Sequence, residues 1–299
     1  MAIRVNRYVL LGKKEVTYGS DPSPTKDNVI NARNIVLDKD FGAQNIKVGD
    51  KSEFYSNLPG IQTAKLSFDV FLTAEKTAGT ESELGELLDA CGYGISGTDN
   101  YNSINDPQSS SSMYFYYYED GLLHKVAGAR GTATFQIEAG IVPFVHFEFT
   151  GLYVSGSAEA IISIDAYRNG TIFVAQANTL TLNSVGYHSY SLEFTDGNKL
   201  AILKDATANY GVYRIEFADA EPKGKVDAIV ETANIGTLEA LVENGTAFDL
   251  VFEKDTGLNP AIVLNVIAED YARENDNGIL RFSIPFIIKS ITINLVTPT

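Results

Sequence analysis

The chain has 299 residues and a formal net charge of −15, with 44% hydrophobic and 20% charged residues. This balance is typical of a folded protein, and the length suits one large domain or two ordinary ones. A single cysteine excludes an intrachain disulfide framework, and three histidines leave little for a zinc site. Both halves of the chain are acidic, and such a surface does not bind nucleic acid by neutralising phosphates.

The N-terminal stretch contains basic residues, but its apolar run, YVLLG, is too short for a signal peptide. No run of the sequence approaches the length of a membrane span. We therefore expect a protein that is made and folded in the cytoplasm, with no membrane among its partners.

Strand patterns dominate the first half. Residues 64–72, AKLSFDVFL, place every second residue on one apolar face. Residues 113–118, MYFYYY, alternate as well, and a turn at 119–121 leads to a returning strand at 122–128. Two further strands are expected at 132–140 and 143–154.

One helix is marked at residues 80–92, TESELGELLDACG. Thr80 and Glu83 have the spacing of a capping box, and Gly92 stands where a C-terminal cap is expected. An apolar stripe is formed by Leu84, Leu87, Leu88 and Cys91. On this stripe Cys91 is expected to be a small buried apolar residue rather than a nucleophile.

The tyrosine-rich strand allows two interpretations. One face carries Met113, Phe115 and Tyr117, and the other carries Tyr114, Tyr116 and Tyr118. An aromatic row can bind a sugar, but such sites lean on tryptophan, of which the chain has none. A half-buried sheet also prefers aromatic residues. We therefore expect the second face to meet a neighbour or to line a wet surface.

The second half repeats this order of elements. A strand at 224–232 precedes a helix at 233–245, and strands follow at 247–252, 260–271 and 278–288. The order predicts a structural duplication, with domains at 1–155 and 156–299 and a joint near 154–160. The main difference between the halves is an insertion before the first helix.

The search for catalytic chemistry finds no motif. DKDFG at 38–42 and ENDNG at 274–278 have a faint calcium-loop look, but both lack EF-hand spacing and are interpreted as hairpin turns. His124, His146 and His188 lie in or beside strands with no nucleophile at informative spacing, and are interpreted as surface or packed residues. A pair of carboxylates for glycoside cleavage stays open, because such pairs meet in space rather than in sequence.

Residues 116–154, YYYEDGLLHKVAGARGTATFQIEAGIVPFVHFEFTGLYV, resemble the tail tube (major tail) proteins of long-tailed bacteriophages. The similarity rests on a D-G turn, a G-A-R-G-T segment, an A-G-x-x-P break and a final F-x-F-x-G-L-Y strand. Upstream, the segment E-x-x-Y-G-x-D-x-x-P-T and the helix end GELLDACGYG fit the same family. The resemblance covers most of residues 10–154 and is looser after Gly156.

The resemblance implies a mainly β fold, a β-sandwich or barrel with a flanking helix, in a virion protein that is not an enzyme and has no cofactor or metal. Subunits would join their sheets edge to edge into rings, rings would stack into a tube with other tail proteins, and DNA would pass through the lumen without specific binding. Because the unit occurs twice, we expect a trimeric ring rather than a hexamer. The alternatives are the inner tube of a contractile injection system and a carbohydrate-binding or glycoside-active module.

The insertion is the candidate ring-stacking loop. It consists of Ala74, Glu75, Lys76, Thr77, Ala78, Gly79, Thr80 and Glu81. These residues are turn-rich and poorly explained as core, so we expect them to contact the next ring. The predicted hairpin at 47–58 is a second candidate for the same contact.

Overall fold

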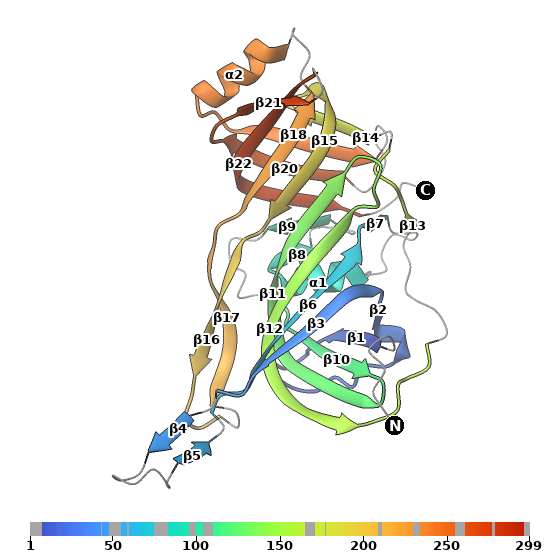
Figure 1. Ribbon diagram of the computed structural model, residues 1–299, viewed down its shortest axis with the longest axis vertical. Helices are drawn as coiled ribbons and strands as arrows, with labels where there is room; N and C mark the ends of the chain where they lie inside the picture. Colours follow the sequence, from blue (N-terminus) through green and yellow to red (C-terminus); the bar gives the residue numbers. More distant parts are fainter. Residues whose placement is uncertain are drawn as a thin grey trace.

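The fold comes from a computed structural model that describes residues 8–42, 44–47, 55–58, 60–74, 83–95, 100–103, 110–164, 171–176, 178–208, 211–229, 234–254, 261–276 and 279–295. Among these residues the chain is mainly β, with two short α-helices, as the sequence predicts. Figure 1 shows the strands gathered in two regions along the long axis, with the first half of the chain in one region and most of the second half in the other.

The first region is a sheet that curls on itself. Its strands are β1 (Tyr8–Lys14), β2 (Val29–Ile30), β3 (Ala32–Asp40), β6 (Thr63–Phe71), β10 (Met113–Glu119), β11 (Leu122–Glu138) and β12 (Phe144–Ala158). The neighbours run β2–β1–β10–β11–β12–β6–β3, all antiparallel. Only Asn31 separates β2 from β3, so one run of chain joins both ends of the sheet and completes a barrel.

The second region is a closed six-stranded barrel. Its strands are β14 (Asn178–Leu182), β15 (Val185–Thr195), β18 (Lys223–Ile229), β19 (Phe248–Lys254), β20 (Ala261–Ala268) and β22 (Ile279–Asn294). The antiparallel pairings run β15–β14–β19–β20–β22–β18 and return to β15. A short strand, β21 (Ala272–Asp276), follows β20 and pairs with β22.

The two barrels pair their strands in the same chain order. In the first barrel, β1 pairs with β2 and with β10, the barrel strand that follows the helix, and the last strand, β12, pairs with β6, which precedes the helix. In the second barrel, β14 pairs with β15 and with β19, which follows the helix, and the last strand, β22, pairs with β18, which precedes the helix. The run β2–β3 of the first barrel therefore corresponds in position to β15 of the second, and β11 corresponds to β20 with β21.

The predicted alternation forms the barrel cores. In β6, Leu66, Phe68 and Val70 are buried while Lys65 is exposed, as the period of two requires. The rings of Phe68 and Phe147 lie 5.8 Å apart, so the predicted apolar faces of β6 and β12 meet inside the first barrel. These strands are confirmed, and the barrel is the architecture that the described residues adopt.

The tyrosine strand β10 differs from its prediction. Met113, Phe115 and Tyr117 belong to the barrel core. The opposite face is not wet, because Tyr114, Tyr116 and Tyr118 are only 3%, 8% and 4% exposed. A second apolar cluster covers them, with residues 161–164 of the chain that leaves β12 packed against it. Alternation told the two faces apart but could not show that the chain itself covers the outer one.

Helix α1 (Glu83–Ala90) confirms the predicted stripe. Leu84, Leu87 and Leu88 are fully buried, and Cys91 is 2% exposed. Gly92 has a φ of +88°, the left-handed geometry that a C-terminal cap requires. Thr80, the predicted cap, lies outside the described residues. Helix α2 (Ile235–Glu243) lies at the end of the second barrel and buries only Leu238 (Figure 1).

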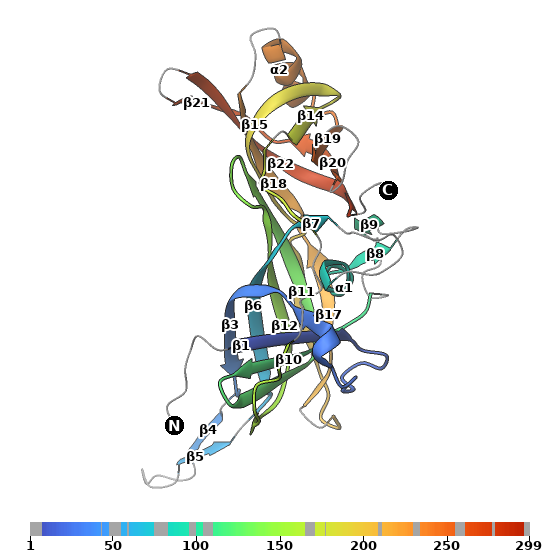
Figure 2. The same cartoon turned by 90° about the vertical axis from the view of Figure 1, so that its right-hand side faces the viewer.

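Short elements surround the barrels. They are η1 (Lys26–Asn28), β4 (Gln44–Lys47), β5 (Tyr55–Leu58), β7 (Thr73–Ala74), β8 (Tyr93–Ile95), β9 (Asn100–Ser103), β13 (Thr171–Ile172), β16 (Asn198–Lys204) and β17 (Val212–Ala220). The sequence interpretation missed the hairpin β16–β17, which lies alongside the first barrel (Figures 1 and 2). Turn residues around Gly211, between two apolar runs, could have revealed it.

Of the two stretches interpreted as hairpin turns, one belongs to a hairpin and the other does not. Residues 38–40 form the end of β3 and pair with β6, and β3 does not pair with the next strand, β4, so that interpretation was wrong for DKDFG. Gly42 there has a φ of +53° and donates its N–H to Asp40 Oδ1 at 2.8 Å. In the other stretch β21 and β22 pair as a hairpin with Asp276 opposite Ile279, while Asn277 and Gly278 lie outside the described residues.

Candidate assembly interface

One strand pairing joins the two barrels. The end of β11 pairs with the end of β15 in antiparallel register, from Thr134 opposite Thr195 to Glu138 opposite Ser191. We call this pairing the internal junction. It makes one continuous sheet of eight strands, which runs in the order β3–β6–β12–β11–β15–β18–β22–β21.

The two faces of the eight-stranded sheet differ in chemistry. The inner face belongs to the barrel cores, and Phe135 and Phe194 stack across the internal junction with ring centres 4.5 Å apart. Partners in register share a face, so the outer face can be followed from strand to strand. Among its charged side chains are Arg33, Asp38, Asp40, Lys65, Asp69, Arg130, Glu138, Glu148, Glu193, Lys223, Lys225, Asp227, Glu274 and Arg281.

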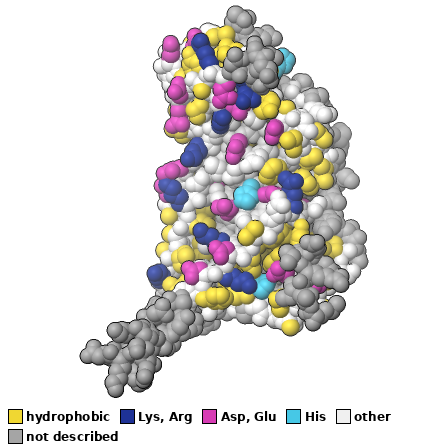
Figure 3. Space-filling view, in the orientation of Figure 1, with side chains coloured by type: hydrophobic (Ala, Val, Ile, Leu, Met, Phe, Trp, Pro, Cys, Tyr) yellow, Lys and Arg dark blue, Asp and Glu magenta, His cyan; other side chains and the backbone are white. Residues whose placement is uncertain are grey.

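Carboxylates outnumber basic groups on this outer face, and both signs are interspersed along it (Figure 3). Several are paired: His146 Nδ1 lies 2.7 Å from Asp69 Oδ1, and Arg281 Nη2 lies 2.9 Å from Glu274 Oε2. Surface ion pairs of this kind stabilise weakly. The face is therefore polar and mildly acidic, with its charges largely balanced in place.

Both edges of the eight-stranded sheet end without a strand partner. Within the described ranges, β3 pairs only with β6, and β21 pairs only with β22. Val36 on β3 is 59% exposed, which is high for an apolar residue in a sheet. Unpaired edges are a template for pairing with another strand, and proteins usually blunt or cover them.

The hairpin β16–β17 holds the internal junction in place. The Tyr18 hydroxyl receives the N–H of Ile215 at 2.6 Å and donates to the Gly128 carbonyl at 3.0 Å. Asn198 Nδ2 donates to the Cys91 carbonyl at 2.6 Å. The guanidinium of Arg130 lies over the Phe217 ring at 5.2 Å. The hairpin thus ties the second half of the chain to three segments of the first.

A buried carboxylate lies between the end of β15 and the start of this hairpin. Asp196 accepts the Ala133 N–H at 3.0 Å, the Asn198 N–H at 3.3 Å and the Thr132 hydroxyl. Burial raises the pKa of Asp196 to about 7, although these hydrogen bonds lower it. Burial also raises the pKa of the nearby Cys91 thiol, so Cys91 is a packed residue and a poor nucleophile.

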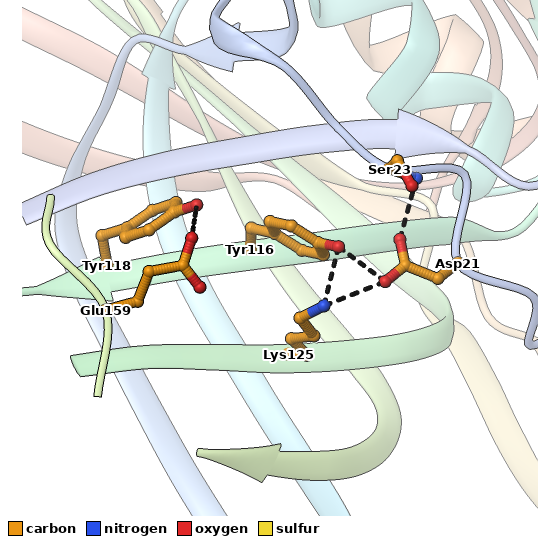
Figure 4. Close-up of polar contacts among 6 residues, drawn as sticks. All are labelled: Asp21, Ser23, Tyr116, Tyr118, Lys125 and Glu159. Atoms are coloured by element: carbon orange, nitrogen blue, oxygen red, sulfur yellow. Dashed lines mark hydrogen bonds and ion pairs between the residues drawn. The ribbon is translucent and has the colours of Figure 1, made fainter. Parts of the chain in front are cut away.

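The hydroxyls of Tyr116 and Tyr118 in the tyrosine strand make hydrogen bonds to segments outside the strand (Figure 4). Tyr116 donates to Asp21 Oδ2 at 2.5 Å, and Lys125 Nζ reaches both that oxygen and the Tyr116 hydroxyl. Tyr118 makes a longer contact, 3.4 Å, to Glu159 Oε1. Burial tends to raise the pKa of Asp21, but the hydrogen bonds from Tyr116 and Lys125 outweigh it and lower the pKa. These contacts tie the segments around Asp21 and Glu159 to β10 and β11, and we assign them a structural role.

The histidines are packed or at the surface, as the sequence predicts: His124 is buried, His146 is half-buried and His188 is exposed. His124 is 6% exposed, and its Nδ1 lies 3.0 Å from the Tyr153 hydroxyl. Burial lowers the pKa of His124. In the described part of the chain, no group of three or more His, Cys, Asp or Glu side chains could hold a metal ion. Nor does any described helix have the length and apolar character needed to cross a membrane.

The predicted ring-stacking loop is described only at its start. Ala74 ends β7 and pairs with Thr171 of β13, which anchors the loop to the segment between the barrels. Its other residues, Glu75 to Glu81, lie outside the described residues. The second candidate, the hairpin around 47–58, is described only at its ends, where β4 and β5 project beyond the first barrel (Figure 1), and residues 48–54 lie outside the described residues.

Comparison with known proteins identifies no relative, because no protein-family model and no curated sequence matches the chain.

Proposed function

We propose that the protein is the tail tube subunit of a long-tailed phage, which assembles into rings that stack into a hollow tube. One observation carries the proposal: a single eight-stranded sheet spans both halves of the chain, and within the described ranges its two edge strands have no partner on their outer side. Long open edges are an aggregation hazard in a monomer but are covered when copies close into a ring. The resemblance in residues 10–154 supports the same assembly.

The polar outer face of the sheet suits the wall of a conduit. We propose that this face lines the lumen, where its excess of carboxylates keeps duplex DNA from adhering. The opposite face is taken up by the barrel cores. The protein would act by assembly and containment, in the virion tail, with other tail proteins as partners and with no chemical step.

The number of chains in a ring follows from the repeated order of pairings. We propose that the two halves are a tandem duplication of one tail-tube unit, each giving four strands to the wall. Six such units would then need three chains, giving a trimer with pseudo-sixfold symmetry. In a hexamer the second half would stand outside the wall, although it shares one continuous sheet with the first half.

The carbohydrate-binding alternative loses its main support. A sugar stacks on exposed aromatic rings, whereas Tyr114, Tyr116 and Tyr118 are covered by the chain's own residues 161–164. The inner tube of a contractile system shares the proposed architecture. A sheath gene beside the one for this protein would favour that version.

Electron microscopy and mass measurement of purified assemblies test the proposal. We expect rings or tubes with threefold symmetry and the mass of three chains per ring. Six chains per ring would contradict the duplication, and a monomer that binds glycans would contradict the tube.

A further inference from the structure

Each barrel carries a hairpin that joins it through the same kind of neck. Hairpin β4–β5 leaves the first barrel between β3 and β6, and hairpin β16–β17 leaves the second barrel between β15 and β18. Gly42 and Gly197 begin the two necks, with φ of +53° and +62°. Each glycine donates its N–H to the side chain two residues before it, Asp40 Oδ1 at 2.8 Å for Gly42 and Thr195 Oγ1 at 3.1 Å for Gly197.

The other side of each neck matches as well. A Cβ added to Gly42 would overlap backbone atoms of Ile61, and one added to Gly197 would overlap backbone atoms of Glu221. Ile61 and Glu221 each lie two residues before the strand partner of the side chain that accepts the glycine N–H. The described residues therefore place the two hairpins at equivalent positions of their barrels.

Strand pairings extend this match across the eight-stranded sheet. Val36 and Ser191 each lie six residues before the neck glycine. From Val36 the row of strand partners crosses β6 and β12 and ends at Thr132 of β11. From Ser191 the row crosses β18 and β22 and ends at Ala272 of β21. The stretch of β11 around Thr132 therefore corresponds to the stretch around Ala272.

The two barrels differ in whether this surface is covered. In the first barrel, residues 130, 131 and 133 are buried, and hairpin β16–β17 lies against them. In the second barrel, residues 270, 272 and 273 are exposed. The helix ends differ in the same way. Residues 90–93 at the end of α1 are buried, and the Cys91 carbonyl accepts a hydrogen bond from the hairpin, whereas residues 243–246 at the end of α2 are exposed.

We propose that the neck and hairpin β4–β5 of one copy lie against the second barrel of a second copy, over residues 270–273 and the C-terminal end of α2. This inference rests on the proposed ring and assigns the hairpin to a contact within it rather than to the next ring. A second copy is the occupant because the chain makes the equivalent contact with itself, through hairpin β16–β17 on the first barrel. Strands β4 and β5 project beyond their own barrel (Figure 1) and, in the described part of the chain, pair only with each other.

Phe41 is the side chain that this contact buries. It immediately precedes Gly42, as Asp196 precedes its own neck glycine, and it is a large apolar residue that is 48% exposed. Asp196 lies buried against Thr132 and the residue after it in β11. By the match above, Phe41 therefore lies on Ala272 and Arg273 of the second copy.

Arg273 provides a surface that an aromatic ring can use. Its side chain is 51% exposed. Its guanidinium lies 5.6 Å from the centre of the Tyr271 ring and 5.8 Å from that of Phe282. A phenylalanine placed on this group loses apolar surface to water and adds a further cation–π contact, so Phe41 anchors the contact.

Photocross-linking locates the contact without assuming a strand register. Phe41 is replaced by the photoreactive p-benzoylphenylalanine, assembled rings are irradiated, and the products that join two chains are isolated on a denaturing gel and identified by mass spectrometry. We expect Phe41 to capture the peptide that contains residues 270–273 of another chain. Rings in which it captures another part of a second chain, or no second chain, would overturn this contact and leave the tube standing.

Truncating the anchor measures what it contributes. We expect Phe41→Ala to raise the concentration at which rings half dissociate by at least about ten-fold. Ile141→Ala is the matched control, because Ile141 is exposed to the same degree, 49%, but lies in the turn after β11, away from the necks. It should change that concentration less than about two-fold. Equal effects of the two variants would overturn the role of Phe41, and absence of self-association in the natural protein would overturn both this contact and the tube.

Discussion

Asp196 is the residue through which we expect pH to affect the internal junction. It is a buried acid that accepts three hydrogen bonds, two from Thr132 and Ala133 of β11 and one from Asn198 of β16. Burial raises its folded pKa from 3.8 to about 7. The folded state therefore keeps a proton that the unfolded state has released, and the protonated acid favours folding.

The stability that Asp196 contributes should fall as pH rises. It is fully present below about pH 3.8 and is lost as pH approaches 7, because the folded pKa is the higher one. Asp196→Asn stays neutral throughout. We therefore expect the difference in Tm between the natural protein and this variant to shift steadily in the variant's favour from pH 4 to pH 7.

Asp219→Asn serves as the matched control, because Asp219 lies on the hairpin that follows Asp196 and its side chain is 65% exposed. It should show no such trend. A difference in Tm that is constant for Asp196→Asn would mean that Asp196 titrates as an ordinary carboxyl.

At the scale of elements, the two helices occupy the same place in the chain order but are packed differently. Both carry a glycine near their start, Gly85 in α1 and Gly236 in α2. A Cβ at Gly85 would overlap the hydroxyl of Tyr101, a fully buried residue of β9, whereas a Cβ at Gly236 would meet nothing within 4 Å. Helix α1 therefore packs tightly against Tyr101 of β9, whereas α2 has open space beside Gly236.

Alanine substitutions should therefore have opposite effects in the two helices. We expect Gly236→Ala to raise the free energy of unfolding by about 0.5–1 kcal/mol, since alanine favours the helix over glycine. Gly85→Ala should lower it by about 1–3 kcal/mol, because Tyr101 must move. Denaturant unfolding of both variants measures this. A stabilising Gly85→Ala would show that α1 can shift away from β9.

At the scale of the whole molecule, assembly in two directions should be separable. The edges β3 and β21 would act within a ring, whereas the loop that begins at Ala74 is the candidate contact between rings. We expect deletion of residues 75–79 to leave a soluble, folded subunit that forms rings but no tubes. Electron microscopy distinguishes the two products.

Replacing residues 75–79 with glycine and serine at constant length is the control for strain at the β7–β13 pairing. It should also stop tube growth. Normal tubes from either variant would show that this loop has another use.

The sequence determined the local structure of this protein. Alternation identified β6, β10 and β12, and a period of three to four residues identified α1, because burial of one face imposes these periods on side chains within a single element. It also placed Cys91 and the stripe of α1 in the core. The same order of elements in both halves was readable without any fold.

Only the tertiary structure decided which strands meet. Backbone hydrogen-bonding groups are the same at every residue, so the sequence of β11 does not state that its end pairs with β15. The alternation of β10 also does not predict that residues 161–164 pack against the cluster of its tyrosines, because these residues lie more than 40 positions away in the chain. The internal junction, the hairpin that holds it and the two open edges therefore emerge only when the barrels are placed together.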